Sequence, residues 1–80
     1  MKLPRGVSGR DLAKRLSALG YEVTRQTGSH VRVTSQQGGE HHVTIPDQDS
    51  LRVGTLASIL RAVSEHHGMG RADLLQQLFG

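Results

Sequence analysis

Hydrophobic residues recur at helical spacing near the beginning of the chain. Three leucines, separated by four and then three residues, would lie on one face of a helix: Leu12, Leu16 and Leu19. Ser8 precedes this segment and is suited to cap its first turn, whereas Gly20 follows it and is suited to end a helix. We therefore predict an amphipathic helix over residues 9–19.

Apolar and polar residues then alternate in three short segments, the pattern of half-buried β-strands. The predicted strands are Tyr21–Arg25, His30–Ser35 and His41–Ile45. In the first strand Tyr21 and Val23 share one face, and in the second Val31 and Val33 would point into the core. The polar, glycine-containing segment 36–40 predicts a hairpin loop, so the strands would pair as an antiparallel sheet.

Helical spacing returns after the third strand. One helix is expected over residues 54–67 and a short one over 71–79, each with a buried apolar stripe. The chain therefore predicts a single α+β domain spanning residues 1–80, in the order α-β-β-β-α with a short extra C-terminal helix. The helices would cover one face of the three-stranded sheet, burying the leucines and valines together and leaving the other face polar.

Composition narrows the class of protein. The 80 residues include no cysteine, which excludes disulfides and thiolate chemistry. No apolar run is long enough to cross a membrane or to act as a secretory signal, so we expect a cytoplasmic protein. Ten Lys and Arg residues against seven Asp and Glu give a formal charge of +3, and most of the basic residues are arginine, which suits a polyanionic partner.

The polar sheet face carries the candidate chemistry. It would display His30, Arg32 and Thr34 from the second strand and His42 and Thr44 from the third. RNA cleavage requires a group that transfers protons near neutral pH and cations that stabilise the transition state, which histidine and arginine supply. The alternative is that this face is polar only to remain soluble.

The remaining histidines do not predict a metal site. In the pair His41-His42 the side chains of adjacent strand residues point to opposite faces, and in His66-His67 they diverge around a helix. A structural role for the second pair is expected, because the end of a helix favours a charged imidazole. Gly38-Gly39 lacks the longer spacing of a phosphate-binding loop, so we expect neither a metal nor a small-molecule cofactor.

Several motifs taken in order resemble the HicA toxin family. They are Gly20-Tyr21 after the leucine-rich helix, Arg25-Gln26-Thr27-Gly28-Ser29-His30, Val43-Thr44-Ile45-Pro46, and Gly54-Thr55-Leu56 with Ile59-Leu60. The resemblance covers nearly the whole chain. It implies a fold like that of double-stranded-RNA-binding domains, cleavage of messenger RNA, and neutralisation by a HicB antitoxin. It also implies that His30 is the catalytic residue. Family members often have histidine where this chain has Gln48.

On this interpretation, His30 transfers a proton during phosphodiester cleavage, and the 2′-hydroxyl is the expected nucleophile because the chemistry is metal-free. Arg25 and Arg32 are the expected phosphate contacts, and Ser29 would orient His30 or contact phosphate. Two alternatives remain open: a module that binds double-stranded RNA without cutting it, and a domain that binds only other proteins.

Overall fold

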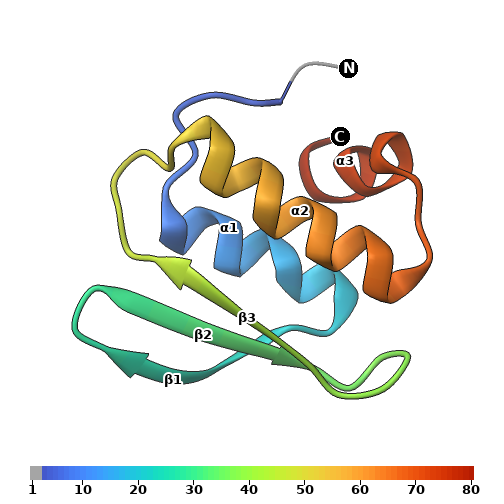
Figure 1. Cartoon of the computed structure of the whole chain (residues 1–80), viewed down its shortest axis with the longest axis horizontal. Helices are drawn as coiled ribbons and strands as arrows, with labels where there is room; N and C mark the ends of the chain where they lie inside the picture. Colours follow the sequence, from blue (N-terminus) through green and yellow to red (C-terminus); the bar gives the residue numbers. More distant parts are fainter. Residues whose placement is uncertain (1–2) are drawn as a thin grey trace.

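The computed structural model describes residues 3–80 as three helices packed on one side of a three-stranded sheet (Figure 1). The elements are α1 (Gly9–Arg15), the 3₁₀ turn η1 (Leu16–Leu19), β1 (Glu22–Thr27), β2 (His30–Ser35), β3 (His41–Pro46), α2 (Val53–His67) and α3 (Arg71–Phe79). The α+β class and the order α-β-β-β-α with a short third helix are confirmed.

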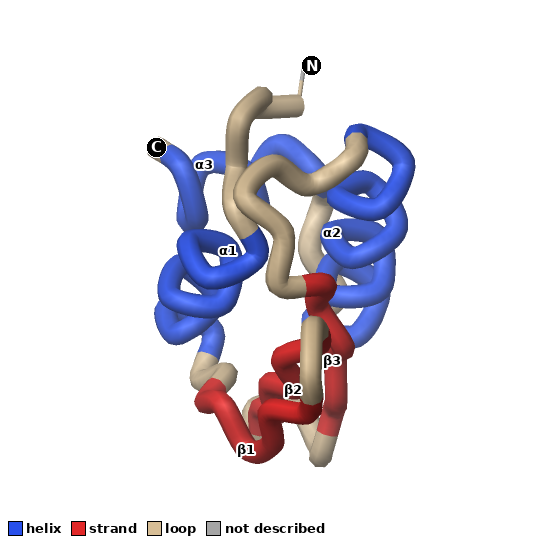
Figure 2. The backbone as a smooth tube through the Cα atoms, turned by 90° about the vertical axis from the view of Figure 1, so that its left-hand side faces the viewer, coloured by secondary structure: helices blue, strands red, loops and turns tan. Residues whose placement is uncertain are grey.

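The sheet is a simple antiparallel meander in the order β1-β2-β3. Figure 2 shows α1 and α2 rising from the same side of the strands, with α3 beside them. This two-layer arrangement leaves one face of the sheet without a helix, as the alternation of residues predicted.

The first helix begins where the sequence indicated and then continues as a 3₁₀ turn. The Ser8 hydroxyl accepts a hydrogen bond from the backbone N–H of Asp11 at 3.0 Å, which caps α1. The last four residues of the predicted helix form η1 instead of a further α-helical turn. Gly20 ends it with φ of +83°, a left-handed conformation that glycine adopts without strain.

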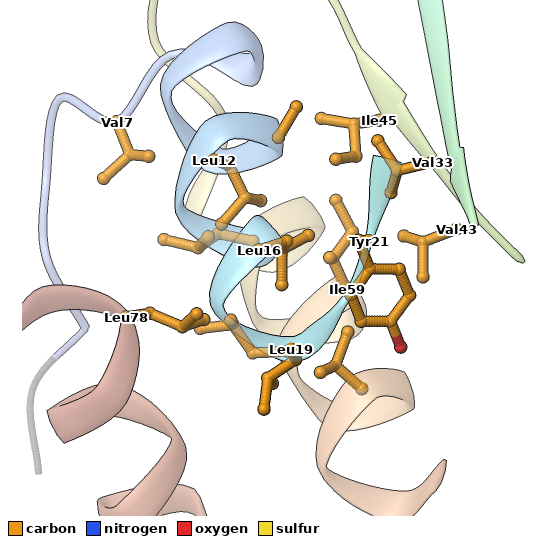
Figure 3. Close-up of a cluster of buried hydrophobic side chains, with 14 of the residues drawn as sticks. Val7, Leu12, Leu16, Leu19, Tyr21, Val33, Val43, Ile45, Ile59 and Leu78 are labelled. Atoms are coloured by element: carbon orange, nitrogen blue, oxygen red, sulfur yellow. The ribbon is translucent and has the colours of Figure 1, made fainter. Parts of the chain in front are cut away.

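The core lies between the helices and the inner face of the sheet (Figure 3). Its fully enclosed members come from every layer: Leu12, Leu16, Tyr21, Val33, Ile45, Leu56, Leu60, Val63 and Leu74. Among the polar residues, Ser35 is completely buried, and its hydroxyl donates to the carbonyl of Leu19 at 2.7 Å. That bond ties β2 to the end of the first helical segment.

The edge strand β1 departs from the prediction. Tyr21 is buried, but Val23 is 57% exposed, although it lies opposite the buried Val33 and so faces the helix side. The register also shifts between Val23 and Arg25, which marks a β-bulge or a similar irregularity in an edge strand. The expectation that the valines are buried together is therefore wrong for Val23.

No helix between residues 3 and 80 is long and apolar enough to cross a membrane.

Candidate nucleic-acid interface

His30 lies at one end of the sheet, directly after a tight hairpin. Gly28 and Ser29 join β1 to β2, and Gly28 has φ of +52°, a conformation that explains why glycine occupies the turn. His30 is the first residue of β2, and it is exposed. Within residues 3–80 its imidazole has no hydrogen-bonding partner, so both ring nitrogens are available to a ligand.

The strand register places two arginines next to His30. His30 lies opposite Thr27 on β1 and opposite Pro46 on β3. The next row on the same outer face pairs Arg25 with Arg32, about 7 Å further along the strands. The prediction that His30 and Arg32 share the face opposite the core is confirmed, because Val31 and Val33 are buried.

The facing arginines create a local excess of positive charge. Arg25 and Arg32 are Cα partners across the β1–β2 ladder, and among the described residues neither forms an ion pair. Like charges directly opposite each other in a sheet are destabilising. An anion such as a phosphate, bound between them, would relieve that repulsion, one row along the sheet from His30.

Contacts from β3 and α1 hold the hairpin in place. The carbonyl of Ser29 accepts a hydrogen bond from the backbone N–H of Asp47 at 2.6 Å. The Asp47 carboxylate in turn accepts from the Arg10 guanidinium at 3.1 and 3.2 Å. Gln48 lies at the same end of the molecule, where its carbonyl accepts from the backbone N–H of Gly9 at 2.9 Å. Ser29 therefore has a positioning contact through its backbone.

A chain of hydrogen bonds crosses the other half of the outer face. The Nε2–H of His42 donates to the Glu40 carboxylate at 2.9 Å, and its Nδ1 lies 2.7 Å from the Thr34 hydroxyl. That hydroxyl lies 2.8 Å from the hydroxyl of Thr24 on β1. The hydrogen bond from His42 is the largest cause that lowers the pKa of Glu40. Both nitrogens of His42 are thus engaged, in contrast to those of His30.

Glu40 and Thr24 were not predicted as partners of this face. The bulge in β1 brings Thr24 to Thr34, and Glu40 belongs to the hairpin loop before β3. The signal in the sequence for the contact between Glu40 and His42 was their spacing, since Glu40 lies two residues before His42.

The other histidines gather at the opposite end of the sheet, around Tyr21. The Tyr21 hydroxyl lies 2.7 Å from Nδ1 of His41 and 3.0 Å from Nε2 of His67. The rings of His41 and His66 are stacked, with centroids 4.3 Å apart. The Nε2–H of His66 points at the carbonyl of Gln37 at 3.0 Å. This tyrosine–histidine cluster joins β3, α2 and the β2–β3 loop.

Burial in this cluster disfavours the charged forms of its side chains. It raises the pKa of Tyr21 to about 12, and it is the largest cause that lowers the pKa values of His41 and His67. The neighbouring imidazoles lower both histidine pKa values further. The expectation that the end of α2 favours a charged imidazole is therefore wrong for His67, since desolvation opposes the attraction of the helix dipole.

Between residues 3 and 80, no group of three histidine or acidic side chains is arranged to hold a metal ion.

Comparison with known proteins identifies the family. A family model described as the HicA toxin of bacterial toxin–antitoxin systems matches residues 9–64, which include α1, the whole sheet and most of α2. Neither a curated protein nor a solved structure was found to match the chain. Because the family model covers more than half of the sequence, the chain belongs to the HicA family of toxins from bacterial toxin–antitoxin systems.

Proposed function

We propose that this toxin is a metal-independent endoribonuclease that cleaves messenger RNA, with His30 as its catalytic residue. The observation that carries the proposal is the imidazole of His30, which has no partner among residues 3–80 and lies on a fixed hairpin, one row from the facing pair Arg25 and Arg32. Its substrate, and hence its site of action, would be cytoplasmic. The element order around the site is that expected of a fold like double-stranded-RNA-binding domains.

The arrangement suits attack by the 2′-hydroxyl of the RNA. His30 takes the proton from this hydroxyl, and the oxygen forms a bond to the adjacent phosphorus. The bond from phosphorus to the 5′-oxygen breaks, and that oxygen receives a proton from the imidazolium or from water. Arg25 and Arg32 stabilise the charge that develops on the phosphate oxygens. The products are a 2′,3′-cyclic phosphate and a 5′-hydroxyl end.

The family membership implies an antitoxin, and we propose that this partner is a HicB-like protein that covers the outer face around His30. Because Arg25 and Arg32 have no ion-pair partner within residues 3–80, a carboxylate from the antitoxin could bind between them. Such a contact would block phosphate binding and catalysis together.

A second candidate function is a non-catalytic module for double-stranded RNA. It is favoured by the lack of aromatic residues on the outer face, since Tyr21 is buried and Phe79 belongs to α3. Without stacking platforms, contacts to phosphates and 2′-hydroxyls would dominate recognition.

The deciding experiment incubates the purified toxin with a defined single-stranded RNA, with and without EDTA, and maps the fragment ends. Cleavage that survives EDTA and gives cyclic-phosphate ends is expected. The His30→Ala variant should lose roughly 10²- to 10⁴-fold in rate, the range supplied by general acid–base catalysis. His42→Gln is the matched control and should continue to cleave, because the His42 nitrogens already bind Glu40 and Thr34.

If wild-type and His30→Ala proteins bind RNA equally and neither cuts it, the binding module is the correct function. Only 5′-phosphate ends, or complete inhibition by EDTA, would contradict the proposed mechanism.

A further inference from the structure

A groove separates α1 from the edge strand β1 on the helix side of the sheet. Its volume is about 610 Å³, and its apolar walls include Ala13 of α1, Val23 of β1 and Val31 of β2. The groove exists because none of the described helices covers β1 there, which is also why Val23 is 57% exposed. We call it the α1–β1 groove.

Two polar side chains that line the groove, Gln26 and Lys14, have no partner among residues 3–80. Gln26 lies opposite the buried Val31, so its side chain is on the groove side of β1. In the described part of the chain, neither the Gln26 carboxamide nor the Lys14 ammonium makes a hydrogen bond or an ion pair. Lys14 and Arg10 line the α1 side and supply positive charge, of which the Arg10 guanidinium is already paired with Asp47, and Glu22 of β1 adds a carboxylate. The groove therefore combines apolar walls with one unpartnered amide and one unpaired ammonium, beside one carboxylate and the Arg10–Asp47 ion pair.

These features fit an unpaired nucleobase with its phosphate. The aliphatic walls can contact the faces of a base, and a carboxamide both donates and accepts hydrogen bonds at a base edge. The unpaired Lys14 ammonium can contact a neighbouring phosphate. A base in a duplex has its Watson–Crick edge occupied, so only single-stranded RNA could place one here.

The strand register brings the groove close to the proposed cleavage site. Gln26 directly precedes Thr27, which lies opposite His30. The path from the outer face at His30, around the free edge of β1 and into the groove is roughly 10–15 Å, judged from the spacing of strands and layers. A few nucleotides of single strand can cover that distance.

An extended peptide is a less suitable occupant. Strand addition requires a regular edge of N–H and C=O groups, and the register shift between Val23 and Arg25 interrupts this edge. RNA needs no such ladder. Resting on the proposed function, we infer that the α1–β1 groove binds one unpaired base of the substrate, a few nucleotides from the cleaved bond, through Gln26.

The test uses a pool of single-stranded RNAs in which the nucleotides around the cut are randomised. Wild-type toxin should show a base preference at one position a few nucleotides from the cut. Gln26→Ala should flatten that preference, with about a tenfold loss at the preferred sites, the value of one specific hydrogen bond. Val23→Glu, which adds a second carboxylate to the groove beside Glu22, should act in the same direction. Gln36→Ala, an exposed glutamine in the β2–β3 loop, is the matched control.

A second measurement separates this inference from the proposed function. Fluorescence anisotropy measures the affinity of two proteins for homopolymeric oligonucleotides: the His30→Ala variant and the double variant with His30→Ala and Gln26→Ala. Base-dependent affinity that Gln26→Ala removes would support the groove even if the wild type never cleaved RNA. Equal affinities for all four oligonucleotides would overturn it, as would cleavage preferences unchanged by both folded groove variants. Groove variants that weaken only antitoxin binding would identify a protein-docking surface and also overturn it.

Discussion

Gly9→Ala tests whether tertiary packing overrides helix propensity at the start of α1. Alanine is the better helix former, and in an exposed helix interior the exchange would stabilise the fold by about 0.5–1 kcal/mol. In this structure Gly9 is buried against the end of β3. A Cβ at Gly9 would overlap the carbonyl oxygen of Pro46 and lie 3.0 Å from its carbonyl carbon.

Both groups in that overlap are backbone, so neither can turn away as a side chain would. The N–H of Gly9 also donates to the carbonyl of Gln48, which fixes α1 against the segment after β3. Relief of the overlap must move the helix away from the sheet, and overpacking of this kind costs about 1–3 kcal/mol. A domain of this size has about 4–12 kcal/mol of total stability, so the loss would be a substantial part of it.

Urea unfolding followed by far-UV circular dichroism measures the change in the free energy of unfolding. Gly9→Ala should lower the midpoint with little change in the slope. Gly54→Ala is the matched control, because Gly54 also lies in the first turn of a helix and a Cβ there meets nothing within 4 Å. It should be neutral or slightly stabilising. A Gly9→Ala protein as stable as the wild type would refute the argument from close packing.

Three further predictions concern the core and the tyrosine–histidine cluster. Leu16→Ala should lower the free energy of unfolding by about 2–5 kcal/mol, because Leu16 is fully buried; a loss below 1 kcal/mol in urea unfolding would contradict this packing. Ser35→Ala should lower the free energy of unfolding by about 1–3 kcal/mol in the same assay, because the carbonyl of Leu19 loses its hydrogen-bond donor. Ser35→Cys should restore less than half of that loss. Stability should fall as the pH drops below about 6.5, because the pKa values of His41 and His67 are lowered in the folded state and the unfolded chain takes up protons first. The midpoints of urea unfolding at pH 7.5 and pH 5 measure this loss of stability. If a protein with both His41→Gln and His67→Gln lost as much stability as the wild type, other groups would cause the pH dependence.

The local order of the fold was predictable from spacing alone. The leucines at intervals of three and four residues identified the first helix, and alternation identified β2 and β3 with their correct inner residues. Parity along β2 also placed His30 and Arg32 together on the outer face. These successes have one physical cause, since the backbone geometry of a helix or strand fixes which residues share a face.

Spacing does not reveal what covers a face or what lies across from it. Val23 has the right parity for the core but is exposed, because no helix reaches the edge strand at that point. The facing of Arg25 and Arg32 depends on the hairpin register and on the shift within β1. The tyrosine–histidine cluster unites residues from β3, α2 and the segment before β1, which only the packing of layers brings together.

The sequence by itself therefore determined the elements, their order and the face on which His30 lies, because these depend on interactions between residues close in the chain. The tertiary structure decided the open groove beside β1, the charge preference of His67 and the close contact at Gly9. Each of these depends on how far apart two segments lie when the helices and the sheet pack together. That distance is set by the volumes of all the buried side chains at once, and no local pattern contains it.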